Sequence, residues 1–162
     1  MPCPCCSGEL CVIGSRKRAW FKGNGDRSKL VIRRLQCQLC SKIHHELPDL
    51  LVPYKRYEAQ SIEEAVAEPP RNDIAAEQST LARWRSWFGA WAVYAAGCLQ
   101  AIALRYDLPA VHASMPDRSA FQLLGRYVGK ASGWLSRVVR PLTNQHLWVT
   151  DPFCLSVRSL LA

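Results

Sequence analysis

The sequence predicts an α+β fold, with a small antiparallel sheet at the N-terminus and a helical domain after it. Three observations support this prediction. Two Cys-x-x-Cys motifs stand about thirty residues apart, at residues 3–6 and 37–40. The residues between them contain two strand-like runs around a Gly-Asn-Gly-Asp turn, which is a strong hairpin signal. From residue 61 onward, capping patterns and apolar residues at helical spacing predict helices.

The two Cys-x-x-Cys motifs are typical of metal-binding knuckles. The tight turn in each motif lets both thiolates reach one tetrahedral ion at about 2.3 Å. Two knuckles supply four sulfurs, which complete the coordination sphere of zinc and leave no open position for water or a substrate. We therefore expect one structural Zn²⁺, held by Cys3, Cys6, Cys37 and Cys40.

Alternatives to this zinc site stay open. Disulfides need an oxidising compartment, whereas the N-terminal MPCPCCSGEL has no apolar signal-peptide core, so we expect a reducing, cytoplasmic location. A thioredoxin-like motif needs a βαβ pattern beside it, and none is visible. Cys5 lies inside the first knuckle, although Cys3 with Cys6 keeps the spacing, and His44 or His45 is an alternative ligand.

The residues between the knuckles predict a basic β-hairpin. Strands are expected over residues 9–20 and 30–35, with the turn at residues 23–26 and a final strand after the second knuckle. This order is the layout of a zinc ribbon. Such a unit is too small to bury a sufficient core, so the metal supplies much of its folding energy. Eight basic residues belong to the hairpin: Arg16, Lys17, Arg18, Lys22, Arg27, Lys29, Arg33 and Arg34.

Positive charge lies on both sides of an acidic segment. The chain has a formal net charge of +8. Residues 1–60 hold eleven basic and five acidic side chains, residues 61–77 hold one and five, and residues 78–162 hold nine and three. Four thiolates around one Zn²⁺ add about −2 to the first region, which stays positive. This balance favours a polyanionic partner, although a solvated basic surface has the same composition.

A connector follows the predicted ribbon. Two prolines in LPDLLVPYKRY interrupt regular structure and predict an extended segment whose apolar residues clamp the ribbon onto the next domain. Lys55 and Arg56 lie between two tyrosines, a pattern that suits a phosphate backbone or a packed domain junction. The sequence thus divides into a zinc ribbon at 1–47, a connector at 48–60 and a helical domain at 61–162.

Two N-terminal helices are predicted in the helical domain. Ser61 and Glu64 form a capping box, which predicts a helix over residues 61–68 before Pro69 and Pro70. Ser79 is a second N-cap, for a candidate recognition helix over residues 79–90. An apolar face on this helix packs against the domain, which leaves three donors free to enter a major groove: Thr80, Arg83 and Arg85. The helix-turn-helix pattern is imperfect because the intervening loop is long.

The C-terminal half predicts a buried central helix and shorter helices around it. Residues 87–104 carry no charge, which is near the lower limit for a membrane span. Their Ala and Gly content and the amphipathic start favour a core helix, so we expect no membrane insertion. Asp117 or Ser119 caps a helix to about Tyr127, and residues 134–139 form further turns before Pro141. The apolar tail over residues 142–162 is expected to dock on this body, and Arg126, Lys130, Arg137 and Arg140 to form a second basic face.

Several segments together resemble a bacterial family of small zinc-ribbon, helix-turn-helix proteins that occurs with mobile elements and is similar to the N-terminal DNA-binding part of certain transposases. The segments are CPCCSG, IRRLQCQLCSKIHHELPDLLVPYKRY, SIEEAV and STLARWRSWF. The resemblance covers roughly residues 1–90 and implies the same four cysteine ligands, with Ser41 where a glycine commonly follows the last one. It implies DNA binding and a mobile-element context without naming a reaction.

The acidic residues argue against an enzyme. A two-metal nuclease or transposase needs converging carboxylates, whereas beyond residue 78 only Asp107, Asp117 and Asp151 remain, beside prolines or at expected caps and turns. We therefore predict non-catalytic binding of double-stranded DNA, with base contacts from Thr80, Arg83 and Arg85. Phosphate contacts are expected from Arg16, Lys17, Arg18, Arg33, Arg34, Lys55 and Arg56. The alternatives are an adaptor that binds a recombinase or transposase, RNA binding and transposase catalysis. The partners expected are duplex DNA, such a recombinase or transposase, and a second copy of the chain in a homo-oligomer.

Overall fold

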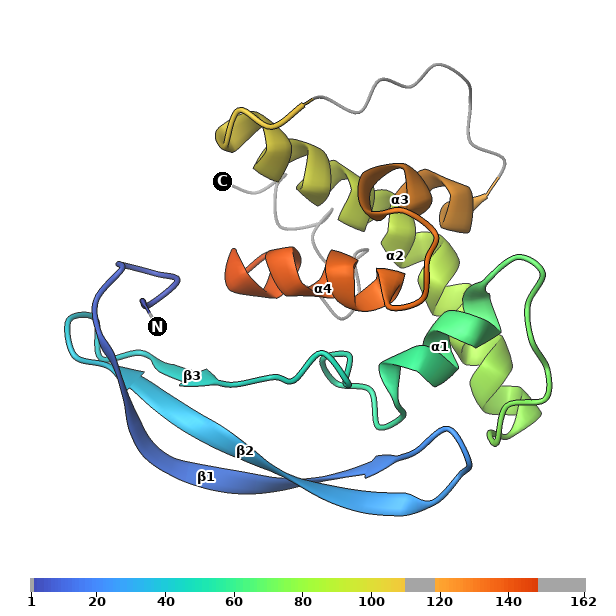
Figure 1. The fold of residues 1–162 in the computed structure, drawn as a ribbon, viewed down its shortest axis with the longest axis horizontal. Helices are drawn as coiled ribbons and strands as arrows, with labels where there is room; N and C mark the ends of the chain where they lie inside the picture. The colour runs from blue at the N-terminus through green and yellow to red at the C-terminus, as the bar shows by residue number, and fades with distance from the viewer. Residues whose placement is uncertain (1, 110–118, 149–162) are drawn as a thin grey trace, which may run out of the picture.

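A three-stranded antiparallel sheet and four helices make up the fold (Figure 1). The structure is a computed structural model that describes residues 2–109 and 119–148. The strands lie in the order β1 (Leu10–Phe21), β2 (Arg27–Cys37) and β3 (Ile43–His45). The helices are α1 (Ala59–Val66), α2 (Gln78–Arg105), α3 (Ala120–Val128) and α4 (Trp134–Asn144). The predicted α+β class and the order of the strands are confirmed.

Strands β1 and β2 form a long, twisted hairpin whose turn and bulge both fall at glycines with positive φ, Gly25 and Gly14. Asn24 and Asp26 close the turn: the Asp26 backbone N–H donates to Asn24 Oδ1 at 3.0 Å, and Gly25 takes a φ of +88°. Pairing then runs from Phe21 opposite Arg27 to Leu10 opposite Cys37, interrupted by a bulge beside Gly14. The predicted hairpin is confirmed. At the turn β1 continues one residue beyond its expected end, and β2 is longer than expected at both the turn and the second knuckle.

The connector folds back on the tip of the hairpin rather than bridging a gap. The backbone N–H of Phe21 donates to Arg56 O at 2.7 Å, and Glu58 N–H donates to Phe21 O at 3.0 Å. The Tyr57 ring stacks on Phe21 and meets Trp84 of α2 edge to face, both at 4.9 Å between centroids. Val52 is fully buried in the helical core. The predicted clamp between ribbon and helices is therefore confirmed.

Helix α2 is the centre of the helical domain, and α1, α3 and α4 pack against it (Figure 1). Trp91, Leu81 and the α4 residue Leu135 are fully buried in the shared core. Cys98 is buried in this core, as predicted. By length and composition alone α2 also qualifies as a helix that could cross a membrane, a test that core helices of other proteins pass too.

A buried carboxylate joins α1 to α4. Glu63 is only 4% exposed, and its oxygens accept hydrogen bonds from the backbone N–H groups of Gly133, Trp134 and Leu135 at 2.8, 3.2 and 3.4 Å. These are donors of the first turn of α4, which no residue of that helix can satisfy. Burial raises the pKa of Glu63, while the three amide donors and Arg137 act to lower it.

Three predicted helix boundaries are wrong. Helix α1 begins at Ala59, two residues before the expected cap, and Ser61 is buried inside it without a capping hydrogen bond. Helix α2 begins at Gln78 after Glu77, so Ser79 is not its cap. Helix α4 continues through Pro141 to Asn144, because its apolar face continues to the fully buried Leu142. At Ser61 and at Pro141, long-range packing outweighs the local signal.

The predictions for the C-terminal part concern the cap of α3, the tail and the second basic face, and only some of their residues are described by the structure. Ser119 caps α3, because its side chain accepts a hydrogen bond from Gln122 N–H at 3.2 Å. At the start of the predicted docked tail, Trp148 lies 5.3 Å from Trp91 between ring centroids. Asp117, Asp151 and the rest of the tail lie outside the described residues. The second basic face is partly used internally: Arg137 donates to backbone carbonyls of residues 128, 131 and 132, and Arg140 pairs with Asp49.

We expect the substitution Glu63→Ala to destabilise the protein by about 2 to 3 kcal/mol, because it leaves buried donors at the start of α4 without an acceptor. Glu63→Gln keeps one acceptor oxygen and should cost less. Gln60→Ala, on the exposed side of the same helix, is the matched control and should change stability by no more than about 0.5 kcal/mol. Urea unfolding followed by far-UV circular dichroism measures all three, and equal effects of Glu63→Ala and Gln60→Ala would contradict the capping role.

Candidate metal centre and basic groove

The four predicted cysteine ligands lie together at one end of the sheet. Their sulfur atoms are all within 4.8 Å of one another. Cys3 Sγ lies 3.7 Å from Cys40 Sγ, and Cys6 Sγ lies 3.4 Å from Cys37 Sγ. A tetrahedral ion with metal–sulfur bonds of 2.3 Å requires sulfur–sulfur edges of about 3.8 Å. The cluster can therefore hold one metal ion.

Each knuckle is built by the same backbone turn. Ser7 N–H donates to Cys3 O at 2.8 Å, and Ser41 N–H donates to Cys37 O at 3.0 Å. Both serines take a positive φ, near 60°, which closes the turn after the second cysteine of each pair. A Cβ on Gly8 would lie 2.9 Å from the Leu39 side chain and 3.0 Å from Cys37 Sγ. Only glycine lets the first knuckle approach the second this closely.

Backbone donors also aim at the sulfurs. Cys5 N–H points to Cys3 Sγ at 3.4 Å, and Cys40 N–H points to Cys37 Sγ at 3.5 Å. Burial acts to raise the pKa of Cys3, but the N–H groups of Cys5 and Cys6 and the neighbouring thiols outweigh it and lower the pKa to about 6. The N–H of Cys40 is the main cause that lowers the pKa of Cys37. Cys3 and Cys37 therefore favour the thiolate, the form that binds metal, whereas neighbouring thiols help to raise the pKa values of Cys6 and Cys40.

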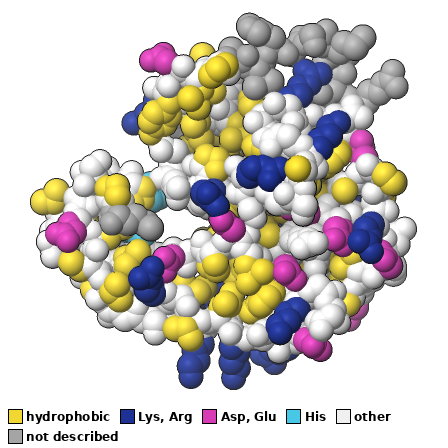
Figure 2. Space-filling model, viewed as in Figure 1, with side chains coloured by type: hydrophobic (Ala, Val, Ile, Leu, Met, Phe, Trp, Pro, Cys, Tyr) yellow, Lys and Arg dark blue, Asp and Glu magenta, His cyan; other side chains and the backbone are white. Residues whose placement is uncertain are grey.

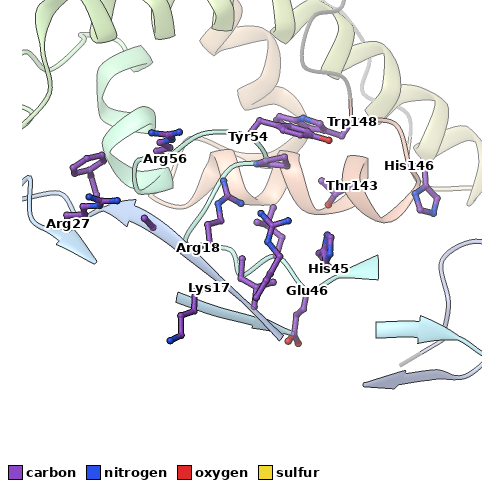
Figure 3. A pocket seen from close by; sticks show the side chains of 16 residues that line it. Lys17, Arg18, Arg27, His45, Glu46, Tyr54, Arg56, Thr143, His146 and Trp148 are labelled. Atoms are coloured by element: carbon purple, nitrogen blue, oxygen red, sulfur yellow. The ribbon is translucent and has the colours of Figure 1, made fainter. Parts of the chain in front are cut away.

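A basic groove of about 990 Å³ runs between the sheet, the connector and the end of α4 (Figure 3). Among the described residues that line it, Glu46 is the one acid, and it already binds Arg33 through two hydrogen bonds of 2.6 Å. The aromatic rings of Phe21, Tyr54 and Trp148 also line it. Five Lys and Arg residues line the groove: Arg16, Lys17, Arg18, Arg27 and Arg56.

Arg18 is the structural member of this group. Its Nη2 donates to Lys55 O at 2.6 Å and to Val52 O at 3.3 Å, which ties β1 to the connector. Burial, and then the nearby charge of Arg16, lower the pKa of Arg18. Within residues 2–109 and 119–148, Arg16, Arg27 and Arg56 form no ion pair with an acid. The groove therefore concentrates positive charge that the described chain leaves uncompensated.

Other predicted DNA-contacting residues differ in how free they are. Arg16, Lys17 and Arg56 are exposed and Arg34 is half-buried, whereas Arg33 pairs with Glu46. The Lys55 ammonium lies 4.1 Å from the centre of the Trp87 ring, and burial lowers the pKa of Lys55. The sequence predicts DNA contacts for these residues from their charge alone. It does not show that Arg33 pairs with Glu46 or that Lys55 lies over Trp87.

The start of α2 does not form a recognisable helix-turn-helix with α1. Residues 67–77 separate the two helices, which is longer than the turn of that motif. Arg85 donates to Ala65 O at 3.0 Å and to Asn72 Oδ1 at 2.6 Å, so its guanidinium holds this loop instead of facing solvent. Arg83 is exposed and donates to Thr80 Oγ1 at 3.2 Å. Of the three predicted base contacts, Arg83 is the most accessible.

Comparison with protein-family models matches residues 3–84 to a family described as a domain of unknown function, DUF6431. The match begins at Cys3 and ends at Trp84, so it spans just over half of the 162 residues. The chain belongs to this family. The DUF6431 region includes the whole sheet, all four clustered cysteines, the connector and α1. Comparisons with curated proteins and with solved structures give no match.

We expect removal of bound metal to unfold the sheet of the DUF6431 region before the helices. The sheet buries few large apolar side chains, so its stability depends mainly on metal bound at the sulfur cluster. A strong chelator should reduce the β-signal in circular dichroism while most of the helical signal stays. Cys37→Ser should lose the metal in the same way, whereas Cys11→Ser, at a half-buried position of β1 outside the cluster, should retain it. Elemental analysis of each purified variant measures the metal. Retention of metal by Cys37→Ser would contradict this ligand set.

Proposed function

We propose that the four-cysteine centre holds a structural Zn²⁺. Four sulfurs at tetrahedral spacing suit zinc, and they leave no position for a substrate. An iron–sulfur group also takes four thiolates, so the metal must be identified by experiment. Elemental analysis after expression with both iron and zinc in the medium separates the two cases, since an iron centre would also absorb visible light.

We also propose that the chain binds double-stranded DNA without catalysing a reaction. The observation that carries this proposal is the groove in which five Lys and Arg residues stand against one acid that is already paired. Arginine is well suited to phosphate because its planar guanidinium donates two parallel hydrogen bonds. Figure 2 shows Lys and Arg side chains projecting at the bottom of the view, where Figure 1 places the hairpin. Phosphates on both sides of the ribbon would meet positive charge.

Binding of a protein partner is a second candidate, and the apolar surface of the sheet favours it. Leu39 at the tip of the second knuckle is 74% exposed, and Val31 on β2 is 65% exposed. Val12 and Ile43 are also exposed on neighbouring strands. Side chains of this kind support an adaptor role, as for a recombinase or transposase partner. Such binding would depend little on salt.

The first test is a titration of the zinc-loaded protein against duplex DNA at two salt concentrations. We expect measurable affinity for random duplex that falls steeply with salt, because phosphate contacts release counterions. DNA flanking the gene is the specific probe, chosen to test the mobile-element context that we predict from the sequence. Tighter binding to the flanking DNA supports a site-specific function. No binding to either duplex, by a protein that contains zinc, would reject DNA binding and favour the adaptor.

The groove predicts which residues set the salt dependence. We expect the pair of substitutions Arg16→Gln and Arg56→Gln to weaken binding to all sequences alike and to reduce the salt slope by about 0.9 for each lost phosphate contact. Arg105→Gln removes one exposed charge outside the groove and is the control for net charge. Fluorescence anisotropy over a salt series measures the slopes. An equal loss per charge at Arg105 would contradict a groove-centred site.

Substitution of Arg83 separates the groove from the start of α2. If α2 contacts base edges, Arg83→Ala should reduce the preference for the flanking DNA over random duplex, with little change in the affinity for random duplex. A fall in both affinities by the same factor would show that Arg83 contributes only charge. Competition experiments with the two duplexes measure this ratio directly.

A further inference from the structure

A second group of metal ligands lies beside the four-cysteine cluster and is not used by it. Cys5 projects from the first knuckle, His44 lies on β3, and His146 follows the end of α4. Cys5 Sγ is 3.0 Å from His146 Nε2, and Cys3 Sγ is 3.4 Å from His44 Nε2. The sulfurs of Cys3 and Cys5 and a ring nitrogen of His44 all lie within 4.8 Å of one another.

The two Cys–His distances approach those of a coordination sphere, whereas His146 stands outside the group of three whose ligand atoms all lie within 4.8 Å of one another. A tetrahedral ion with a sulfur ligand at 2.3 Å and a nitrogen ligand at 2.0 to 2.1 Å holds the two atoms about 3.5 Å apart. The Cys3–His44 separation of 3.4 Å is close to that edge, and the Cys5–His146 separation of 3.0 Å needs only a small movement of exposed side chains. Two sulfurs and two imidazoles form a set that suits Zn²⁺.

We propose that the chain binds a second Zn²⁺ through Cys5, His44 and His146, with Cys3 Sγ shared between the two ions. A thiolate has enough lone pairs to bridge two metals. The charge balance also favours the second ion: one Zn²⁺ with four thiolates carries a net −2, and a second Zn²⁺ with the Cys5 thiolate brings the pair to about −1. The Lys42 ammonium, 3.7 Å from Cys5 Sγ, compensates part of what remains.

The backbone at His146 holds its ring toward this site. His146 takes a φ of +56°, an unusual conformation for a residue other than glycine, and its N–H donates to Thr143 O at 3.1 Å. The His44 and His146 rings are 5.8 Å apart between centroids. Figure 1 shows the end of α4 facing the N-terminal loop. A second ion would therefore join α4 to the first knuckle across the groove of about 910 Å³ that separates them.

This linkage distinguishes the two centres. The first uses only residues of the DUF6431 region, whereas His146 lies outside residues 3–84. Cys5 and His146 are both exposed, while Cys3 and Cys37 are buried. The second ion should consequently exchange faster and bind less tightly than the first. It would add a metal-dependent contact between ribbon and helical domain, beyond DNA binding itself.

Cobalt(II) titration of the metal-free full-length chain tests the proposal, because thiolate-bound cobalt absorbs visible light. We expect two equivalents to bind, the second with a spectral change of its own. The double variant Cys5→Ser with His146→Ala should bind one equivalent and keep the first spectrum. Cys11→Ser with His45→Ala removes the same chemical groups from neighbouring positions and should bind two.

The outcomes separate this inference from the structural zinc site. One equivalent in the unmodified chain, or two in the Cys5/His146 variant, overturns the second site while leaving the first intact. Loss of the first equivalent from the unmodified chain contradicts the four-cysteine centre as well. Far-UV circular dichroism of the double variant with one cobalt bound checks that its fold is kept. The single variant Cys5→Ser leaves α4 unchanged and should also bind only one equivalent of cobalt tightly.

Discussion

The contact between the two cysteine knuckles is the constraint on which the N-terminal half depends. The sheet buries little apolar surface: Trp20, Ile32 and Leu35 are its buried large side chains. Three such residues, each contributing about 1.5 to 3 kcal/mol on burial, cannot offset the entropy of ordering more than forty residues. The sulfur cluster holds Leu10 opposite Cys37, and this register extends to the bulge beside Gly14, where it shifts. Metal binding at this point is then equivalent to folding of the sheet.

The tip of the hairpin is held by different chemistry. There the backbone of Phe21 pairs with the connector. The Tyr57 ring stacks on Phe21 and meets Trp84 edge to face, so aromatic contacts connect the hairpin to α2. The hairpin is thus fixed at both ends, by sulfur at one and by aromatic rings at the other. Its middle carries Arg16, Lys17 and Arg18, which line the groove together with Arg27 near the turn and Arg56 on the connector.

Local patterns predicted the parts of this structure that depend on local geometry. The Cys-x-x-Cys spacing and the Asn-Gly turn predicted the four-cysteine cluster and the hairpin, because each knuckle and the turn are decided within a few residues. The capping box at Ser61 failed because Glu58 and Ala59 are already fixed by the connector, through Ala59 N–H and Leu50 O at 2.8 Å. The roles of Glu63 and Arg85, and the meeting of Cys5 with His146, depend on partners far away in the sequence, so no pattern within one segment reveals them.

Strand β3 connects the four-cysteine cluster to the basic groove, because it places one residue beside each. Adjacent residues of a strand point to opposite faces, and here His44 contacts Cys3 Sγ while the next residue, His45, lines the groove. Burial, followed by the charges of Arg16 and Arg34, lowers the pKa of His45, so its imidazole is neutral more readily than usual. With only three residues, β3 cannot move at one histidine and stay fixed at the other. A backbone shift at His44 would therefore also move His45 and the wall of the groove in which we place the phosphates.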